Sequence, residues 1–205
     1  MYPYLKPLMD RVLAAIGLFL LSPVMALVAW RIYKEDHGPV LFKHERVGLN
    51  GRPFGCYKFR SMRQDAPATL ARWKAENSLE WQEFQRASKL VNDPRVLKVG
   101  QFLRKTSLDE LPQLLNVLKG EMSLVGPRPV TEDELCHYEE HEGLTAYLRT
   151  VPGVTGLWQV SGRSDTTYRE RVLLDRQYAA RITFRQDAQI LVRTLAVPFS
   201  QRGAY

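Results

Sequence analysis

The densest group of candidate chemical residues lies in "RKTSLDELPQLLNVLKGEMSLVGPRP" (104–129), where Asp109 and Glu110 stand side by side at the start of a helical pattern. Adjacent side chains point in different directions, so one carboxylate can act as a nucleophile while the other orients a group or holds a cation. Carboxylates also suit Mg²⁺, and the start of a helix suits an anion. Asp109 and Glu110 are therefore candidate catalytic residues and candidate Mg²⁺ ligands.

A structural interpretation competes with this one. Ser107 and Glu110 have the spacing of a capping box, in which two side chains satisfy backbone groups at a helix start. That helix would place Pro112 one turn inside, where proline removes a backbone hydrogen bond. If Pro112 instead holds the first helical position, Asp109 and Glu110 precede the helix as free carboxylates. The spacing leaves both interpretations open.

Arg128 stands between two prolines in "GPRP", so its backbone is restricted and its guanidinium could grip a phosphate with two parallel donors. A surface arginine in a turn is the alternative. Arg104 and Arg163 are similar candidates. Gly156 and Gly162, in a glycine-rich loop, allow close backbone approach to a ligand, although turn formation explains them equally well. Neither GxxxxGK[ST] nor GxGxxG occurs, which argues against a P-loop enzyme and a dinucleotide binder.

The segment "HYEEH", from His137 to His141, matches a short zinc-protease pattern. Both histidines could lie on one helix face and bind zinc, but the sequence marks no third ligand. An acid-rich, solvated helix face explains the segment as well. A zinc-dependent membrane protease is therefore an alternative function.

The net charge of +7 over 205 residues favours an anionic partner. The arginines are spread along the chain without a recognisable nucleic-acid motif, so we expect no nucleic-acid partner. A basic, non-catalytic membrane scaffold is a second alternative. Cys56 and Cys136 form no readable disulfide framework and are expected to stay as thiols.

An apolar run from Val12 to Trp30 contains no charged side chain, but Ser22-Pro23 interrupts it. A cleaved signal peptide and a straight span are two interpretations, since about 20 apolar residues cross a bilayer. Basic residues flank both ends, and the positive-inside tendency would keep both flanks cytoplasmic. A helix broken at Ser22-Pro23, which enters and leaves by the same face, satisfies both observations; a kinked crossing helix stays open. We expect residues 1–34 to be this membrane anchor.

Residues 35–205 read as one compact domain of α/β class, mostly helical with a small hairpin or sheet. Asn50-Gly51 between two strand-like runs predicts a β-hairpin. Helical patterns follow at 65–90, with an interruption at Asn77-Ser78, and then at 96–105, 111–120, 131–143 and twice within 166–197; short strands are expected within 123–130 and 151–165. The last helix has Phe184, Leu191 and Leu195 on one face, as an interfacial amphipathic helix would.

Three long segments in fixed order, "KFRSM" (58–62), 103–130 and "PGVTGLWQVSGRSD" (152–165), resemble the bacterial sugar transferase family, the monotopic polyprenyl-phosphate phosphoglycosyl transferases. The resemblance covers nearly the whole chain, and "GLWQVSGRSD" looks most like the galactose phosphotransferases of that family. It suggests the catalytic module without the extra N-terminal membrane helices of larger members. Lys58 and Arg60 of "KFRSM" join Arg104, Arg128, Gly156, Gly162 and Arg163 as expected substrate-binding residues.

The resemblance implies an Asp-Glu dyad at Asp109-Glu110, a Mg²⁺ requirement and a re-entrant helix bent at Ser22-Pro23. It implies transfer of a sugar 1-phosphate, galactose or glucose, from a UDP-sugar to undecaprenyl phosphate with release of UMP, through a covalent aspartyl phosphosugar. This would be the initiating step of exopolysaccharide, capsule or O-antigen synthesis. The expected location is the bacterial inner membrane, with the catalytic domain on the cytoplasmic face. A homodimer is one arrangement that the sequence leaves open.

Overall fold

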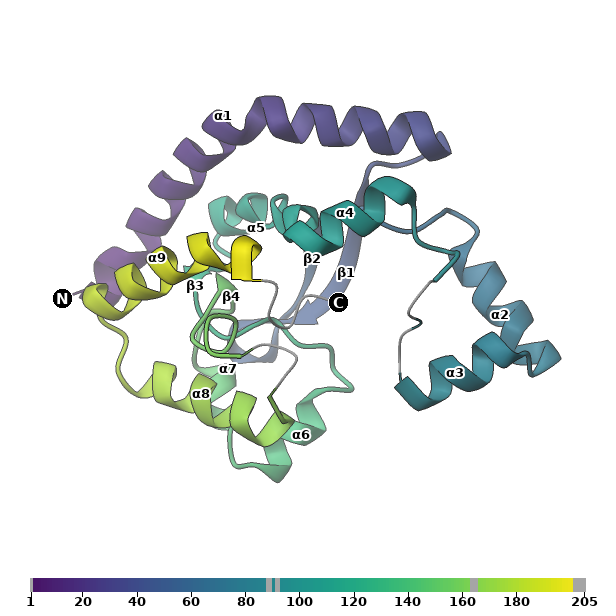
Figure 1. Ribbon diagram of the computed structural model, residues 1–205. Helices are drawn as coiled ribbons and strands as arrows, with labels where there is room; N and C mark the ends of the chain where they lie inside the picture. Colours follow the sequence, from purple (N-terminus) through teal and green to yellow (C-terminus); the bar gives the residue numbers. More distant parts are fainter. Residues whose placement is uncertain (1, 88–89, 91–92, 163–165, 201–205) are drawn as a thin grey trace.

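A computed structural model describes residues 2–87, 90, 93–162 and 166–200. The fold is mostly helical, with two small sheets and one long apolar helix at the start of the chain (Figure 1). The helices are α1 (Tyr2–Asp36), α2 (Ala66–Glu76), α3 (Leu79–Ala87), α4 (Lys98–Thr106), α5 (Gln113–Lys119), α6 (Leu135–Glu140), α7 (Leu144–Leu148), α8 (Tyr168–Ala180) and α9 (Phe184–Ser200). The strands are β1 (Leu41–Val47), β2 (Pro53–Phe59), β3 (Ser123–Val125) and β4 (Gly153–Thr155), and the 3₁₀ turns are η1 (Leu49–Gly51) and η2 (Leu108–Glu110).

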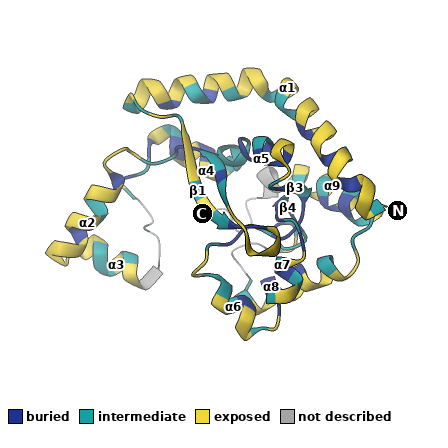
Figure 2. Cartoon of the chain, turned by 180° about the vertical axis from the view of Figure 1, so that it is seen from behind, coloured by how far each residue is buried: buried dark blue, intermediate teal, exposed yellow. Residues whose placement is uncertain are grey.

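Helix α1 continues through Ser22-Pro23 and is bent near its middle (Figure 1). Pro23 has no N–H to donate to the carbonyl of Phe19, four residues earlier. The Ser22 hydroxyl donates to that carbonyl instead, at 2.7 Å. The expected break is therefore a bend, and the helix does not end there. Among the described residues, α1 alone is long and apolar enough to cross a membrane, and only 11% of its most apolar window is buried, unlike a core helix (Figure 2).

The two arms of α1 pack on different parts of the body. Ala14 in the first arm contacts a buried cluster with Leu114 and Val117 of α5. Val28 and Ile32 in the second arm belong to another cluster, which contains Phe59, Leu97 and Leu103. Burial of apolar side chains on both sides of the bend stabilises the packing of α1 on the body, by about 25 cal/mol for each Å² of apolar surface removed from water.

Ion pairs hold both ends of α1, one of them buried and the other partly buried. Lys6 Nζ lies 2.6 Å from a carboxylate oxygen of Asp187 in α9. At the other end, Asp36 pairs with the guanidinium of Arg60, which also donates to the Asp36 backbone carbonyl. The helix is thus joined to the body at both termini.

The expected hairpin is confirmed: β1 pairs with β2 in antiparallel register, from Leu41 opposite Phe59 to Val47 opposite Pro53. The free edge of β2 is covered by Asn116, whose side chain accepts from Tyr57 N and donates to the carbonyl of Gly55. Asn116 of α5 therefore satisfies two backbone groups on this edge of β2.

Helices α2 and α3 confirm the predicted interruption, since Asn77 between them is left-handed, with φ of 48°. Figure 1 shows this pair standing off from the rest of the described chain. Gly120 ends α5 with φ of 78°, as its C-cap position requires.

The start of α5 decides between the two interpretations of Ser107. Ser107 is left-handed, with φ of 58°, and its side chain forms no cap hydrogen bond. Asp109 and Glu110 lie in η2, and Pro112 stands directly before α5. The capping-box interpretation is therefore wrong, and both acids precede the helix.

The second sheet pairs β3 and β4 in parallel, Ser123 opposite Gly153 and Val125 opposite Thr155. The expected helices within 131–143 and 166–197 are present as α6, α8 and α9. Helix α7 was not expected from the sequence; it brings Tyr147 into a buried cluster with Val130 and Tyr138. Of the three residues expected on one face of α9, Phe184 and Leu195 are exposed, but Leu191 is partly buried and packs with Ile190 and Tyr178.

Candidate active site

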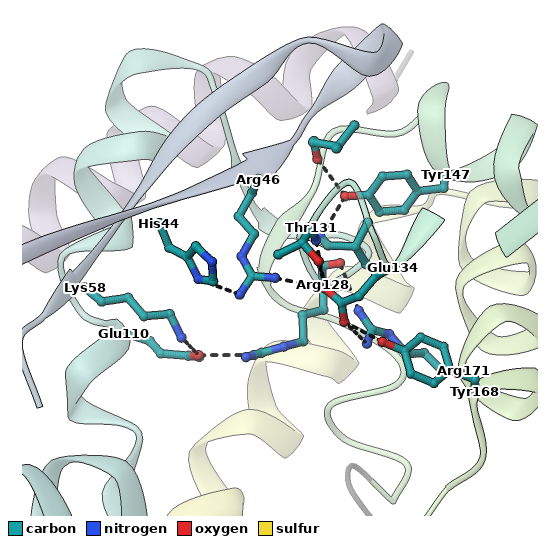
Figure 3. Close-up of polar contacts among 12 residues, drawn as sticks. His44, Arg46, Lys58, Glu110, Arg128, Thr131, Glu134, Tyr147, Tyr168 and Arg171 are labelled. Carbon is teal, nitrogen blue, oxygen red and sulfur yellow. Dashed lines mark hydrogen bonds and ion pairs between the residues drawn. The ribbon is translucent and has the colours of Figure 1, made fainter. Parts of the chain in front are cut away.

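Glu110 lies between two cations brought by different parts of the chain. Lys58 of β2 donates to Glu110 Oε1 at 2.7 Å, and Arg128 donates to the same oxygen at 3.1 Å (Figure 3). Burial opposes ionisation, but the charges of Arg128 and Lys58 outweigh it and hold the pKa of Glu110 at about 2. The same attraction raises the pKa of Arg128. Both donors use one oxygen, so the other oxygen accepts no hydrogen bond from the described residues.

Asp109 has a different environment. Its carboxylate forms no hydrogen bond or ion pair with any residue in the part of the chain that the structure describes. Burial, followed by the negative charge of Glu110, raises the pKa of Asp109. A carboxylate that is partly desolvated and unpartnered keeps its lone pairs for an incoming electrophile or cation.

The loop that carries Arg128 is fixed from several sides. Val47 N donates to Val130 O at 2.9 Å, which joins the loop to the end of β1. The Tyr147 hydroxyl accepts from Val130 N at 3.1 Å and donates to the carbonyl of Val47 at 2.7 Å (Figure 3). Arg171 of α8 reaches the carbonyl of Arg128 at 3.4 Å. These contacts fix the loop in the position from which the Arg128 guanidinium donates to Glu110.

A second carboxylate, Glu134, holds several donors together beside the Arg128 loop. It accepts five hydrogen bonds or ion pairs, from Arg46 (3.0 Å), Thr131 N (2.7 Å), Thr131 Oγ1 (3.1 Å), Tyr168 and Arg171 (3.5 Å). Burial opposes ionisation here too, but these donors hold the pKa of Glu134 at about 2. The Arg171 guanidinium also lies 4.6 Å from the ring centroid of Trp158, as a cation–π contact.

Arg46 and His44 are site residues that the sequence reasoning missed. Arg46 donates to Glu134 and also contacts His44 Nδ1 at 2.9 Å (Figure 3). Burial, and then the charges of Arg46 and Lys58, lower the pKa of His44 and favour its neutral form. The sequence pattern could have identified both residues. Every second side chain of a strand lies on the same face, so residues 42, 44 and 46 of β1 share one face. Phe42 pairs with Lys58 of β2, so His44 and Arg46 lie on the same face of the hairpin as Lys58.

The other expected substrate-binding residues lie in varied places. Arg60 is buried in its pair with Asp36 and does not join the Glu110 centre. Arg104 donates to the Ser61 hydroxyl at 2.9 Å, and its charge acts on Asp109 without a direct bond. Arg163 lies outside the described residues.

The two candidate glycines differ as well. Gly156 is buried, and a Cβ there would lie 2.1 Å from the carbonyl oxygen of Gly126, so close backbone packing explains this glycine. Gly162 is half-buried with φ of 153°, and a Cβ there would meet Thr166 at 2.7 Å.

The "HYEEH" segment does not assemble a metal centre. Within the described ranges, no group of three or more His, Cys, Asp or Glu side chains could hold a metal ion. The His137 ring instead stacks on Tyr168, with centroids 4.1 Å apart, and His141 ends α6. The zinc-protease alternative is not favoured.

The donor set fits a Mg²⁺ ion that shares its ligands with a substrate. Asp109 and the second oxygen of Glu110 offer carboxylate oxygens without hydrogen-bond donors among the described residues. Mg²⁺ in phosphoryl-transfer sites is usually held by one or two carboxylates, together with water and phosphate oxygens. Two adjacent acids are enough for that mode of binding.

Comparison with known protein families identifies the class. The model of the family described as bacterial sugar transferase matches residues 1–201. The chain belongs to this family.

Among curated relatives, the chain is 46% identical over 202 residues to the undecaprenyl-phosphate galactose phosphotransferase of Salmonella typhimurium, covering 98% of this chain and 42% of that protein. It is 44% identical over 196 residues to the exopolysaccharide production protein ExoY of Rhizobium meliloti, covering 96% of this chain and 86% of the relative. It is 40% identical over 210 residues to the UDP-glucose:undecaprenyl-phosphate glucose-1-phosphate transferase of Xanthomonas campestris, covering 98% and 40%. The chain thus spans less than half the length of two of these relatives and most of ExoY.

Proposed function

We propose that this chain transfers a sugar 1-phosphate, galactose or glucose, from a UDP-sugar to undecaprenyl phosphate and releases UMP. The observation that carries this proposal is the contrast between two neighbouring carboxylates. Asp109 has no hydrogen-bond partner among the described residues, whereas Glu110 is held by two cations. The names of the relatives support the two substrates. The name of ExoY supports a place in exopolysaccharide synthesis; capsule and O-antigen synthesis are the other pathways that the proposed product would serve.

Two displacements account for the proposed reaction. An Asp109 carboxylate oxygen attacks the sugar-linked phosphorus, the bond from that phosphorus to the bridging oxygen of UMP breaks, and UMP leaves with the electron pair. A phosphate oxygen of the lipid then attacks the aspartyl phosphosugar, and cleavage of the acyl phosphate bond restores the carboxylate. Covalent catalysis of this kind divides one difficult transfer into two easier ones.

The surrounding residues have distinct proposed roles. Arg128 and Lys58 neutralise the diphosphate, where phosphoryl transfer gains most from positive charge. Glu110 accepts from both cations through one oxygen, so its other oxygen would be available to hold Mg²⁺. When bound by Asp109 and Glu110, Mg²⁺ would supply further charge neutralisation at the phosphate oxygens.

The decisive experiment measures UMP release by purified protein with undecaprenyl phosphate and, separately, UDP-galactose, UDP-glucose and UDP-N-acetylated sugars. We expect release with one of the hexoses, and parallel initial-rate plots as a ping-pong mechanism requires. A basic membrane scaffold would release no UMP from any of them. Intersecting plots would instead indicate a ternary complex and would remove the covalent intermediate from the proposal.

We further propose that residues 1–34 form a re-entrant anchor in the inner membrane and that 35–205 form the catalytic domain on its cytoplasmic face. The support is the exposed apolar surface of α1, its bend, and the basic residues at both ends. Because α1 ends at Asp36, the junction falls within its last turn.

The topology is testable with an accessibility tag at the N-terminus. In the parent chain the tag should react only from the cytoplasmic side. In a Ser22→Ala, Pro23→Leu variant the helix should straighten and the tag should move to the periplasmic side. A periplasmic tag in the parent would overturn re-entry, and an unmoved tag in the variant would show that Ser22-Pro23 does not cause it.

A further inference from the structure

A groove of about 660 Å³ lies between the second arm of α1 and helix α4, apart from the Glu110 and Glu134 centres. Figure 1 shows these two helices running along the same side of the body. The groove is lined by Leu27, Val28, Arg31, Lys34, Glu35, Lys98, Val99, Phe102 and Leu103. We call it the α1–α4 groove.

The α1–α4 groove carries three cations, Arg31, Lys34 and Lys98, and one acid, Glu35, so its net charge is positive. Arg31, Lys34 and Lys98 form no ion pair with any acidic residue that the structure describes. The acid in the groove, Glu35, turns both carboxylate oxygens to the start of α4, where they accept from Lys98 N at 2.6 Å and from Val99 N at 3.1 Å. Three cations against one acid leave the lining with an excess of two positive charges, which makes the rim of the groove a site for a negatively charged group.

The rest of the lining is apolar. Leu27 and Phe102 are 59% and 56% exposed, so both present apolar surface to an occupant. Val28 and Leu103 form a buried floor, within the cluster that fixes α1 to the body. An occupant that satisfies both parts has an anionic head and an apolar chain.

The cationic end of the groove lies at the far end of α4 from the Asp109 turn. Lys98 is the first residue of α4, and Asp109 lies beyond its last residue, Thr106. A nine-residue helix separates its ends by about 12 Å at 1.5 Å per residue. An anion held by Lys98 and by the end of α1 therefore lies at the end of α4 opposite to the one that leads to Asp109.

Aromatic residues at the same end of α1 indicate the level at which the groove lies in the proposed membrane. Trp30 and Tyr33 are 50% and 55% exposed, and Lys34 Nζ lies 5.0 Å from the ring centroid of Trp30. Exposed Trp and Tyr beside basic residues are typical of the level of lipid headgroups.

We propose that the α1–α4 groove binds one anionic phospholipid, with its headgroup phosphate against Arg31, Lys34 and Lys98 and an acyl chain along Leu27 and Phe102. The site rests on the proposed membrane association of α1 and is independent of the proposed chemistry. The bound lipid bridges the second arm of α1 to α4 and holds the helix at its depth.

The test is native mass spectrometry of the full chain, extracted from vesicles of phosphatidylcholine with phosphatidylglycerol. The parent should retain one phosphatidylglycerol. Arg31→Gln with Lys98→Gln should weaken retention by about fivefold for each cation removed. Arg72→Gln with Arg169→Gln, a matched loss of two exposed charges outside the groove, should retain the lipid as the parent does. Arg31→Lys with Lys98→Arg keeps both charges and should restore binding, which separates loss of charge from misfolding.

Three results would overturn the proposal. Equal retention by the groove and control variants would show general surface attraction and no site. Displacement of phosphatidylglycerol by undecaprenyl phosphate, with a raised KM for that lipid alone in the groove variant, would assign the groove to the acceptor. Failure of the parent to float with vesicles of phosphatidylcholine and phosphatidylglycerol would remove the membrane association itself, while UMP exchange into UDP-sugar would still test the chemistry separately.

Discussion

Glu110 and Glu134 share an unusually low pKa, about 2 in each case, but their surroundings differ. Glu110 accepts two cations on one oxygen and stands beside an unpartnered carboxylate, Asp109. Glu134 accepts five donors across both of its oxygens, from β1, its own turn and α8 (Figure 3). The low pKa alone therefore does not distinguish a reacting centre from a structural one. The distinguishing property is the unused lone pairs, which Glu110 and Asp109 keep and Glu134 does not.

The largest effect is expected at the unpartnered carboxylate. Asp109→Asn keeps the size of the side chain but removes the proposed nucleophile, so UMP release should fall by at least about 10³-fold. Glu110→Gln should cost about 10²- to 10³-fold, because Lys58 and Arg128 lose the charge that positions them. Asp109→Asn should unfold at nearly the parent temperature, whereas Glu110→Gln should unfold at a lower one, because the depressed pKa of Glu110 makes its charge stabilising at neutral pH; a thermal melt in detergent would check both. Near-parent turnover in Asp109→Asn would contradict the nucleophile assignment.

Glu134→Gln tests the structural role of Glu134 against the reacting role of Glu110. Five donors lose a charged acceptor at once, so the free energy of unfolding should fall by about 2 kcal/mol. Activity should fall only about tenfold, since Glu134 acts on the reaction through the position of Arg46 and the Arg128 loop. Urea unfolding beside the UMP assay measures both quantities. A loss of activity as large as that of Glu110→Gln, at unchanged stability, would place Glu134 in the chemistry.

Asp175 offers a third carboxylate with the opposite shift. Burial raises its pKa to about 6, and one of its oxygens has no hydrogen-bond partner within the described chain. The folded state therefore binds a proton that the unfolded state has released, and this contribution to stability is lost as pH rises from about 4 to 6. Asp175→Asn keeps an acceptor for Tyr138 and should be more stable than the parent at pH 7, by about 2 kcal/mol.

The comparison at low pH is the control for that variant. Near pH 4 the parent is protonated at Asp175, so the stability difference should vanish. The Glu134 contribution has the reverse sign: its pKa is depressed, so its stabilisation is present at neutral pH and lost as pH falls from about 4.5 towards 2. A difference between Asp175→Asn and the parent that did not change with pH would refute the titration of Asp175.

Much of the fold could be predicted because the signals were local. Asn50-Gly51 marked the hairpin, Gly120 marked the end of α5, and the interruption at Asn77 was confirmed. Helix α7 was missed because five residues carry too little periodicity to be recognised. The capping-box interpretation failed because Ser107 adopts a left-handed conformation that sequence spacing does not encode.

The site could be predicted only in part, for a related reason. Lys58, Glu110 and Arg128 were candidates, and the structure brings them together. Arg60 was expected to bind substrate because it shares the "KFRSM" segment with Lys58. In the structure Arg60 instead forms an ion pair with Asp36, 24 residues earlier in the chain. Glu134 and Arg171 were not foreseen, because their roles depend on contacts between α8, the turn before α6 and β1 that no local pattern contains.

Helix α1 is joined to the body by ion pairs at both ends, through Lys6 with Asp187 and Asp36 with Arg60. In the proposed membrane orientation, the helix and the dyad therefore move as one rigid unit. The height of Asp109 above the bilayer surface is then a constant of the protein, and membrane thickness does not change it. Only the part of the acceptor that lies between the bilayer surface and that height meets the protein, so shortening the far end of the polyprenyl chain should leave the transfer rate unchanged.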